Sequence, residues 1–253
     1  MKILIWGTGA MARALALGLK HAHQDFEFLC WNPTQEKAQS LARELSGKLW
    51  SAGDAFDVVI LGFKPQKMPE VKLPDCSQAT VLSLLAATSI DKISTYIPAR
   101  YYIRTMPNLA VEKNAGVLLW AQRNLNPEAQ AFWQGTFSQL GLAPFLEDSA
   151  IDLYTVVSGC APAYAFQWLK SAEDFILESG GDPALARELL RASLLGALDS
   201  VTTADDLSQR ISQVTSKGGV TEAVLTAWKS QHESYMRDGL AAGLERMREL
   251  TRS

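Results

Sequence analysis

A glycine-rich turn stands directly between a β-strand pattern and a helix pattern at the start of the chain. Residues 2–6 are mostly β-forming, residues 7–12 read GTGAMA, and the apolar spacing from residue 10 to residue 19 is helical. A strand, a G-x-G-x-x-A turn and a helix in this order are the context in which such a motif binds a dinucleotide. The first glycine permits the tight turn, the second lets the backbone approach a pyrophosphate, and the small third residue allows close helix–strand packing. We therefore expect a pyrophosphate site at the start of this helix, where backbone N–H groups are unpaired.

Strand and helix patterns alternate from this turn to about residue 146. The runs at 57–63 and 80–85 are apolar almost throughout, as in parallel strands that are buried on both faces. Further strands are expected over residues 26–31, 101–104, 116–120 and 143–146, and further helices over residues 35–45, 89–96 and 127–140. This alternation predicts an α/β fold whose amino-terminal part is a Rossmann-type, doubly wound and mainly parallel sheet.

The strand patterns end near residues 147–150, and only helix patterns follow. The expected helices cover residues 162–178, 183–201, 205–214, 221–228 and 230–250. The last of them carries an apolar stripe that needs a partner. About a hundred residues of helix would form only a thin core alone, so we expect these helices to pack against a second copy of the chain. The sequence therefore predicts two domains, an NAD(P)-binding domain over residues 1–149 and an all-helical dimerisation and substrate domain over residues 150–253.

Charge and hydropathy exclude several classes of partner. The chain has 24 Lys and Arg against 27 Asp and Glu, a net charge of −3, and no basic block, so neither nucleic acid nor an anionic membrane surface is indicated. No apolar stretch approaches the about 18 residues of a membrane-spanning helix, and the first residues do not resemble a signal peptide. We expect a cytoplasmic protein that acts on a small molecule.

Cysteine and histidine give little material for metal or nucleophilic chemistry. The three cysteines, Cys30, Cys76 and Cys160, are odd in number and far apart, which suits neither a disulfide framework nor a zinc site. The chain also contains only three histidines. We therefore expect no metal site, and neither a Ser–His nor a Cys–His catalytic arrangement.

The segment after the second strand indicates which dinucleotide is bound. An NAD enzyme usually has an acidic residue here, which binds the ribose hydroxyls. This chain instead has the uncharged Asn32 and Thr34, with Lys37 one helical turn further on. That composition suits a 2′-phosphate, so NADPH is favoured over NADH. The alternative is that water and backbone alone hold the ribose.

Three other polar residues follow strands and are candidates for the same edge of the sheet. Lys64 is either a proton-transfer group or a residue that holds its loop, which Pro65 keeps extended. Arg104 either pairs with an anion or forms a structural salt bridge. Asn108 either hydrogen-bonds the nicotinamide carboxamide or binds a loop carbonyl.

Two glycine-containing segments of the helical half are further candidates. Residues 158–164, SGCAPAY, lead tightly into a helix, which suits close packing of that helix against the nicotinamide. Residues 214–221, VTSKGGVT, open another helix, where successive free N–H groups can bind a carboxylate and Thr221 offers a hydroxyl. Ordinary helix capping by Thr221 explains the second segment equally well.

At these segments the chain resembles the pyrroline-5-carboxylate reductase family, and the resemblance covers almost the whole length. GTGAMARAL, FKPQ, RTMPN, SGCAPAY and VTSKGGVTEAV occur in the order and spacing of that family, and the last two are its most specific motifs. The resemblance implies an amino-terminal domain that binds NADPH or sometimes NADH, and a helical domain that dimerises by interleaving, with further assembly of dimers. It also implies transfer of a hydride to the imine carbon of 1-pyrroline-5-carboxylate, which gives L-proline.

The same resemblance assigns residues to the two halves of the site. The expected cofactor-binding residues are Gly7, Gly9, Ala10, Met11, Ala12, Asn32, Thr34, Phe63, Lys64, Pro65 and Asn108. The expected substrate-binding residues are Ser216, Gly218, Gly219, Val220 and Thr221. The N–H groups of the last three would hold the substrate carboxylate, and the Thr221 hydroxyl, the catalytic candidate, would face the ring nitrogen.

The chain departs from the family pattern in several places. Cys160 and Ala161 stand where the family usually has serine and glycine, Leu109 and Ala110 replace threonine and proline, and Val220 replaces a threonine. Two alternatives therefore stay open. One is a reductase of another cyclic imine or of a small carboxylate substrate, and the other is a nucleotide-binding regulatory relative without turnover.

Overall fold

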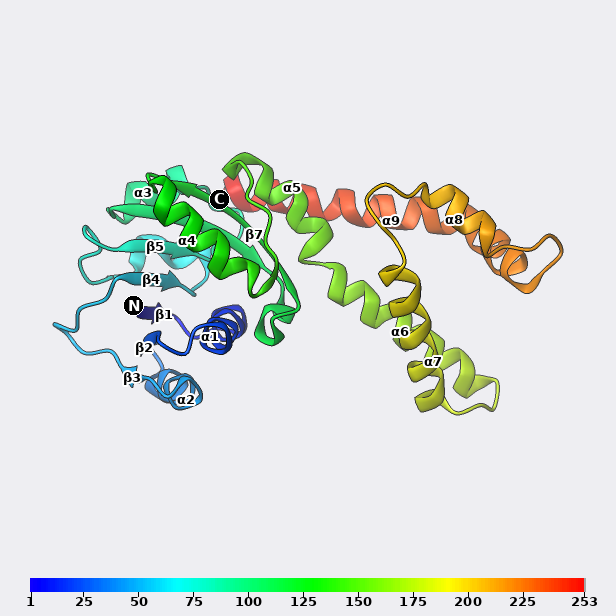
Figure 1. Cartoon of the computed structure of the whole chain (residues 1–253), viewed down its shortest axis with the longest axis horizontal. Helices are drawn as coiled ribbons and strands as arrows, with labels where there is room; N and C mark the ends of the chain where they lie inside the picture. Colours follow the sequence, from blue (N-terminus) through cyan, green and yellow to red (C-terminus); the bar gives the residue numbers. More distant parts are fainter. Residues whose placement is uncertain (253) are drawn as a thin grey trace. The chain divides into compact units, whose positions relative to one another are not determined.

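The computed structural model describes residues 1–252, apart from the side chains of residues 229–233 and 252. Its contacts divide the chain into two compact units, Met1–Cys160 with Gly243–Ser253, and Ala161–Ala242 (Figure 1). The division falls after Cys160, whereas the sequence pattern changes near residue 149. The domain boundary at 149/150 stays a prediction.

A single twisted sheet forms the centre of the first unit (Figure 1). Its strand order is β3-β2-β1-β4-β5-β6-β7-β8. The strands are β1 (Lys2–Trp6), β2 (Glu27–Trp31), β3 (Lys48–Leu49), β4 (Val58–Leu61), β5 (Thr80–Ser83), β6 (Tyr101–Pro107), β7 (Gly116–Arg123) and β8 (Gly141–Leu142). The strands from β3 to β6 are parallel, β7 is antiparallel to β6, and β8 is parallel to β7. The order 3-2-1-4-5-6 is that of a dinucleotide-binding Rossmann sheet, so the predicted fold is confirmed.

Two hydrophobic cores lie on the two faces of this sheet, because side chains alternate between the faces along each strand. Helices α1 (Ala10–Ala22), α2 (Gln35–Leu45) and α4 (Pro127–Ser138) bury apolar side chains on one face. The 3-10 helix η1 (Pro65–Glu70) and helices α3 (Ile90–Tyr96) and α5 (Asp148–Ser158) do so on the other. A second 3-10 helix, η2 (Leu109–Lys113), packs against α1. Because β1, β2 and β4 are parallel, their carboxyl ends lie at the same edge of the sheet.

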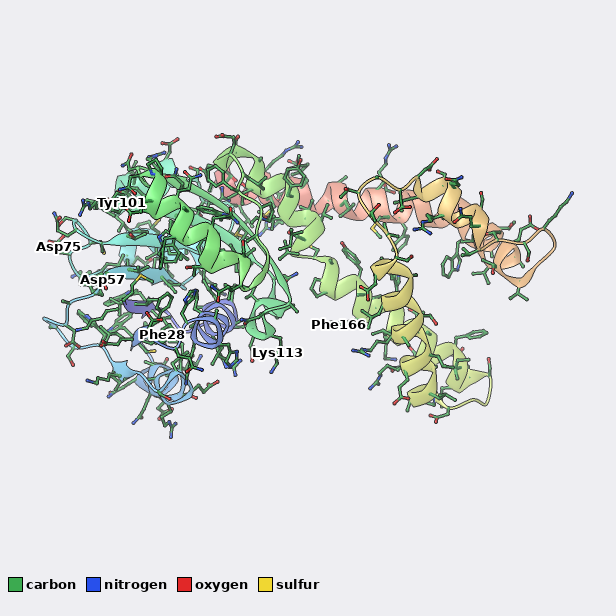
Figure 2. The ribbon with its side chains drawn as sticks, in the orientation of Figure 1. Phe28, Asp57, Asp75, Tyr101, Lys113 and Phe166 are labelled. Atoms are coloured by element: carbon green, nitrogen blue, oxygen red, sulfur yellow. The ribbon has the colours of Figure 1, made fainter. Side chains whose placement is uncertain are left out.

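Helices make up the second unit, whose elements are α6 (Ala161–Glu178), α7 (Pro183–Asp199), α8 (Leu207–Gln213) and most of α9 (Val220–Arg252). Asp182 caps α7, accepting a 2.9 Å hydrogen bond from the Ala184 N–H, and Pro183 is the first helical residue. No residue of α6, α7 or α8 is buried. Phe166 is 68% exposed (Figure 2) and Leu198 66%. Among the described residues, no helix is sufficiently long and apolar to cross a membrane.

Several elements differ from those predicted from the sequence. The helices expected over 221–228 and 230–250 are one helix, α9, because the polar stretch between them contains neither glycine nor proline and does not interrupt the backbone. The strand expected over 143–146 is β8, two residues earlier, and Phe145 forms only an isolated bridge, since Pro144 has no N–H to pair. Helix α5 was not predicted, although its Ile151 and Val156 are buried.

Candidate active site

The turn between β1 and α1 brings two backbones into contact. Gly7 has a φ of +97°, which side-chain-bearing residues rarely adopt, and its N–H donates a 2.9 Å hydrogen bond to the carbonyl of Trp31. A Cβ added to Gly7 would lie 2.8 Å from the carbonyl carbon and oxygen of Gly62. Only glycine therefore satisfies both the conformation and the space at this position.

Gly62, directly after β4, contacts the glycine turn, and the sequence analysis does not include it among the site residues. A Cβ on Gly62 would lie 2.2 Å from the Gly7 carbonyl oxygen and 2.6 Å from the Cβ of Ala12. The glycine that ends the apolar run of β4 was the available signal. Its meaning depends on the parallel pairing of β1 with β4, which brings the two glycines to the same edge of the sheet.

The start of α1 is shaped to receive an anion. Gly9 is the N-cap, it has no side chain with which to cap the helix, and no acidic residue lies in the first turn. The N–H groups of Ala10, Met11 and Ala12 lie in this first turn, where an α-helix provides them with no carbonyl partner. The close backbones, the free N–H groups and the positive end of the helix dipole fit a pyrophosphate.

The Asn32 side chain binds the glycine turn. Its Oδ1 accepts a 3.3 Å hydrogen bond from the Thr8 N–H, and its Nδ2 donates a 3.2 Å bond to the Thr34 carbonyl. The amide thus connects the end of β2 to the turn after β1. The Thr8 hydroxyl oxygen is buried and has no hydrogen-bond partner within the described residues. Thr34 is the N-cap of α2, but its side chain makes no capping bond.

The segment after β4 presents two exposed lysines, Lys64 and Lys67, and Lys67 pairs with Glu70 at 3.0 Å. Lys64 is exposed and precedes η1, in which Pro65 is the first residue. Phe63 is partly buried and packs on the same core as Trp6 and Leu61. The packing of Phe63 holds the segment against the sheet and leaves the Lys64 side chain facing water.

Asn108 has a structural role in the loop after β6. Its Oδ1 accepts 3.2 Å hydrogen bonds from the N–H groups of Ala110 and Val117. Its Nδ2 donates a 3.4 Å bond to the carbonyl of Ser158, the last residue of α5. Of the two interpretations given by the sequence, this geometry favours binding of a main-chain carbonyl, which lies at the end of α5 and not in a loop.

Arg104 forms a structural salt bridge rather than an open anion site. The residue is 1% exposed, its Nη1 lies 3.1 Å from an Asp148 carboxylate oxygen, and its Nη2 pairs with Asp152. Asp148 also accepts a 2.9 Å hydrogen bond from the N–H of Ile90, at the start of α3. Arg104 therefore links β6 to α5, and its charge is neutralised.

The loop before α9 lies within the helical unit and resembles an anion-binding helix start. Gly218 has a φ of +71°, and its N–H donates a 2.7 Å hydrogen bond to the Glu222 carboxylate. A Cβ on Gly219 would lie 2.4 Å from the Ser216 hydroxyl oxygen. Helix α9 begins at Val220, so Thr221, which was expected to cap this helix, lies in its first turn and is exposed.

Two of the three cysteines are buried and are not nucleophiles. Burial raises the pKa of the Cys30 thiol to about 12 and that of Cys76 to about 11, so neither is a thiolate near neutral pH. Cys160 is exposed between α5 and α6. Within the part of the chain that the structure describes, no three His, Cys, Asp or Glu side chains gather as metal ligands would.

Family models match both parts of the chain. The model described as pyrroline-5-carboxylate reductase dimerisation matches residues 148–250, which supports homo-oligomerisation. The model described as NADP oxidoreductase, coenzyme F420-dependent, matches residues 2–86, the part that contains the glycine turn. Together with that turn, these matches make the chain a nicotinamide-nucleotide-dependent oxidoreductase.

Several named proteins match this chain over nearly its full length. The pyrroline-5-carboxylate reductase of Haemophilus influenzae is 31% identical over 258 residues, covering 96% of this chain and 95% of that protein. The crystal structure of the Streptococcus pyogenes enzyme has a TM-score of 0.90 at 22% identity and covers 98% of both chains. That of the Plasmodium falciparum enzyme with NADP bound has a TM-score of 0.87 at 20% identity and covers 99% of this chain and 98% of the other. These two structures show the fold. The 31% identity to the Haemophilus influenzae protein, over nearly the full length of both chains, shows that the chain belongs to the pyrroline-5-carboxylate reductase family.

Proposed function

We propose that this enzyme reduces 1-pyrroline-5-carboxylate to L-proline, with NADPH as the hydride donor. The near-full-length similarity to the Haemophilus influenzae protein of that name carries the proposal. The glycine turn after β1 and the Gly218-Gly219 loop before α9 support it, because each suits one half of the reaction. The first is built for a dinucleotide and the second for a small carboxylate.

The first unit would bind the cofactor through backbone groups. Gly7, Gly9 and the first turn of α1 receive the pyrophosphate, and Gly62 leaves the space that this approach requires. Lys64 and Pro65 border the nicotinamide side, and Asn108 maintains the adjacent loop through its hydrogen bonds. When it is bound there, the nicotinamide supplies the hydride.

The preference for NADPH rests on the end of β2. Residues 32–34, between this strand and α2, contain no carboxylate. The start of α2 has no side-chain cap, and its first N–H groups lie beside the exposed Thr34 and Lys37, although the Glu36 carboxylate belongs to the same turn. A 2′-phosphate gains from such a helix start, whereas a ribose hydroxyl gains little. Asn32 would contribute indirectly, since its amide is bonded to Thr8 and Thr34.

The loop of the helical unit would bind the substrate. The N–H groups of Val220 and Thr221, in the first turn of α9, suit the substrate carboxylate. The Gly219 N–H, the third group assigned to it, donates a 3.0 Å hydrogen bond to the Ser216 carbonyl and would have to exchange that partner for the substrate. The Thr221 hydroxyl is the group assigned to the ring nitrogen, where it donates or relays the proton. A protonated imine is already electrophilic, so orientation and one proton are the main demands on the protein.

We further propose that the chain is a homodimer built through the helical unit, and that any larger assembly forms from these dimers. Helices α6 and α7 bury no residue. Their apolar side chains Phe166, Phe175 and Leu198 are each about two-thirds exposed. Large apolar side chains left exposed on several helices are typical of an interface with another protein chain. A cytoplasmic location stays a prediction.

The proposed reaction is tested by following oxidation of NADPH in the presence of racemic 1-pyrroline-5-carboxylate, with NADH in parallel. We expect rapid oxidation with formation of L-proline from one enantiomer, and a higher kcat/KM with NADPH. A protein that binds NADPH but oxidises it with no pyrroline carboxylate would contradict the proposal. Turnover of another cyclic imine would then indicate a different substrate, and no turnover at all would indicate a regulatory relative.

A further inference from the structure

Three tryptophans gather at the carboxyl ends of three neighbouring strands. Trp6 is the last residue of β1, Trp31 is the last residue of β2, and Trp50 directly follows β3. Trp6 and Trp31 are paired in register and their rings stack, with centroids 3.8 Å apart and planes inclined by 12°. Trp50 meets Trp6 edge-on at 5.3 Å. This edge of the sheet is the one from which the glycine turn leaves.

Burial differs along this cluster. Trp6 is 3% exposed and is thus a core residue, whereas Trp31 is partly exposed. Both Trp31 and Phe63 pack at the margin of the same core, one after β2 and the other after β4. Core packing alone accounts for Trp6. Core packing does not by itself explain why the Trp31 indole, which stacks on the buried Trp6 indole, is partly exposed.

Trp31 is also bonded to the glycine turn. Its carbonyl accepts the 2.9 Å hydrogen bond from the Gly7 N–H, and the next residue, Asn32, bonds to the Thr8 N–H. In this fold the segment after the second strand holds the adenosine ribose, and the pyrophosphate lies on the glycine turn. The Trp31 ring therefore lies next to the adenosine end of the cofactor site and not next to the nicotinamide end.

We propose that the Trp31 indole stacks on the adenine base of the dinucleotide, with Trp6 supporting it from behind. Every purine has a flat π face, and an aromatic side chain that is already ordered loses little freedom when a base stacks on it. The fixed Trp6–Trp31 pair provides such order. The inference rests on dinucleotide binding at the glycine turn, as in the proposed function, and is independent of which imine is reduced.

The test is calorimetric titration of the full-length protein with adenosine 2′,5′-bisphosphate, which carries the base and the 2′-phosphate but no nicotinamide. Trp31→Ala and Trp31→Leu should each weaken binding by about tenfold or more, within the range for loss of one base–aromatic stack. Trp31→Phe retains a π face and should bind within about threefold of wild type. The difference between Leu and Phe separates stacking from apolar packing.

Trp50→Leu is the matched control, because Trp50 is partly exposed and touches Trp6 but does not end β2. It should bind the bisphosphate as the wild type does. The inference is wrong if Trp31→Leu binds as tightly as wild type, if Trp50→Leu loses as much affinity, or if the wild type does not bind the bisphosphate. Wild-type protein that binds the bisphosphate in this Trp31-dependent way but leaves 1-pyrroline-5-carboxylate unreduced would support the inference and contradict only the proposed reaction.

Discussion

Gly62 and Gly7 face each other so closely that a Cβ on Gly62 would lie 2.2 Å from the Gly7 carbonyl oxygen. The contact joins the ends of β4 and β1. It holds the glycine turn close to the end of β4, and the start of α1 has no side-chain cap. Two backbones approach here because both residues lack a side chain, and a pyrophosphate requires the same closeness.

Gly62→Ala should therefore weaken NADPH binding by about tenfold or more, since relief of the clash displaces either the turn or Ala12, and overpacking of this kind costs about 1–3 kcal/mol. Titration calorimetry with NADPH measures the change. Gly135→Ala is the control, because Gly135 lies in α4 with no atom within 4 Å of its added Cβ. An unchanged dissociation constant for Gly62→Ala would remove this contact from the cofactor site.

Thr221→Ala should lower kcat by about 10²-fold, the low end for a positioned proton-transfer group, while NADPH affinity stays unchanged. Thr221 is exposed in the first turn of α9, and alanine is a good helix former, so the fold should tolerate the change. Thr221→Ser keeps the hydroxyl and should recover most of the rate. Thr226→Ala, at an exposed position on the same helix, is the control, and equal kcat values for Thr221→Ala and Thr226→Ala would exclude Thr221 from catalysis.

Arg104→Ala should destabilise the protein by about 3–5 kcal/mol, because it leaves Asp148 and Asp152 without their buried cation. Arg123→Ala is the matched control. Its partner Asp91 has a side chain that is 86% exposed, so the loss should be at most about 1 kcal/mol. Urea denaturation of both variants measures the difference, and similar midpoints would show that the Arg104 pairs contribute little.

Phe166→Glu should shift the chain from dimer towards monomer, because it places a charge on the exposed apolar face of α6. Analytical ultracentrifugation over a concentration series should show a dimer dissociation constant raised by about tenfold or more, corresponding to roughly 1.4 kcal/mol. Phe132→Glu changes a phenylalanine on α4 of the first unit that is 45% exposed, and it should leave the assembly intact. Dimers that persist equally in both variants would place the interface elsewhere.

Much of the first unit could be predicted from local patterns. The glycine turn, the apolar runs of β4 and β5 and the helix α2, Gln35–Leu45, are each encoded within a few consecutive residues. Helix α7 could be predicted from its Asp-Pro start for the same reason. Residue spacing is sufficient to predict an element wherever the strand, turn or cap is encoded within one short segment.

The remaining features depend on pairs of residues that are distant in sequence. The Asn32 amide bonds to Thr8, and the Arg104 cation pairs with residues more than 40 positions further on. The Gly62 contact likewise exists only once β4 lies beside β1. Sequence patterns identify the type of such residues but not their partners. This is why Arg104 and Asn108 each kept two interpretations until the structure favoured one.

The central claim is hydride transfer from the nicotinamide to the imine carbon of 1-pyrroline-5-carboxylate. The most direct measurement uses NADPH that carries deuterium at the transferred position of the nicotinamide, followed by mass spectrometry and NMR of the product. We predict L-proline with a single deuterium on ring carbon 5, the former imine carbon. No proline, or proline without deuterium at that carbon, would contradict the account.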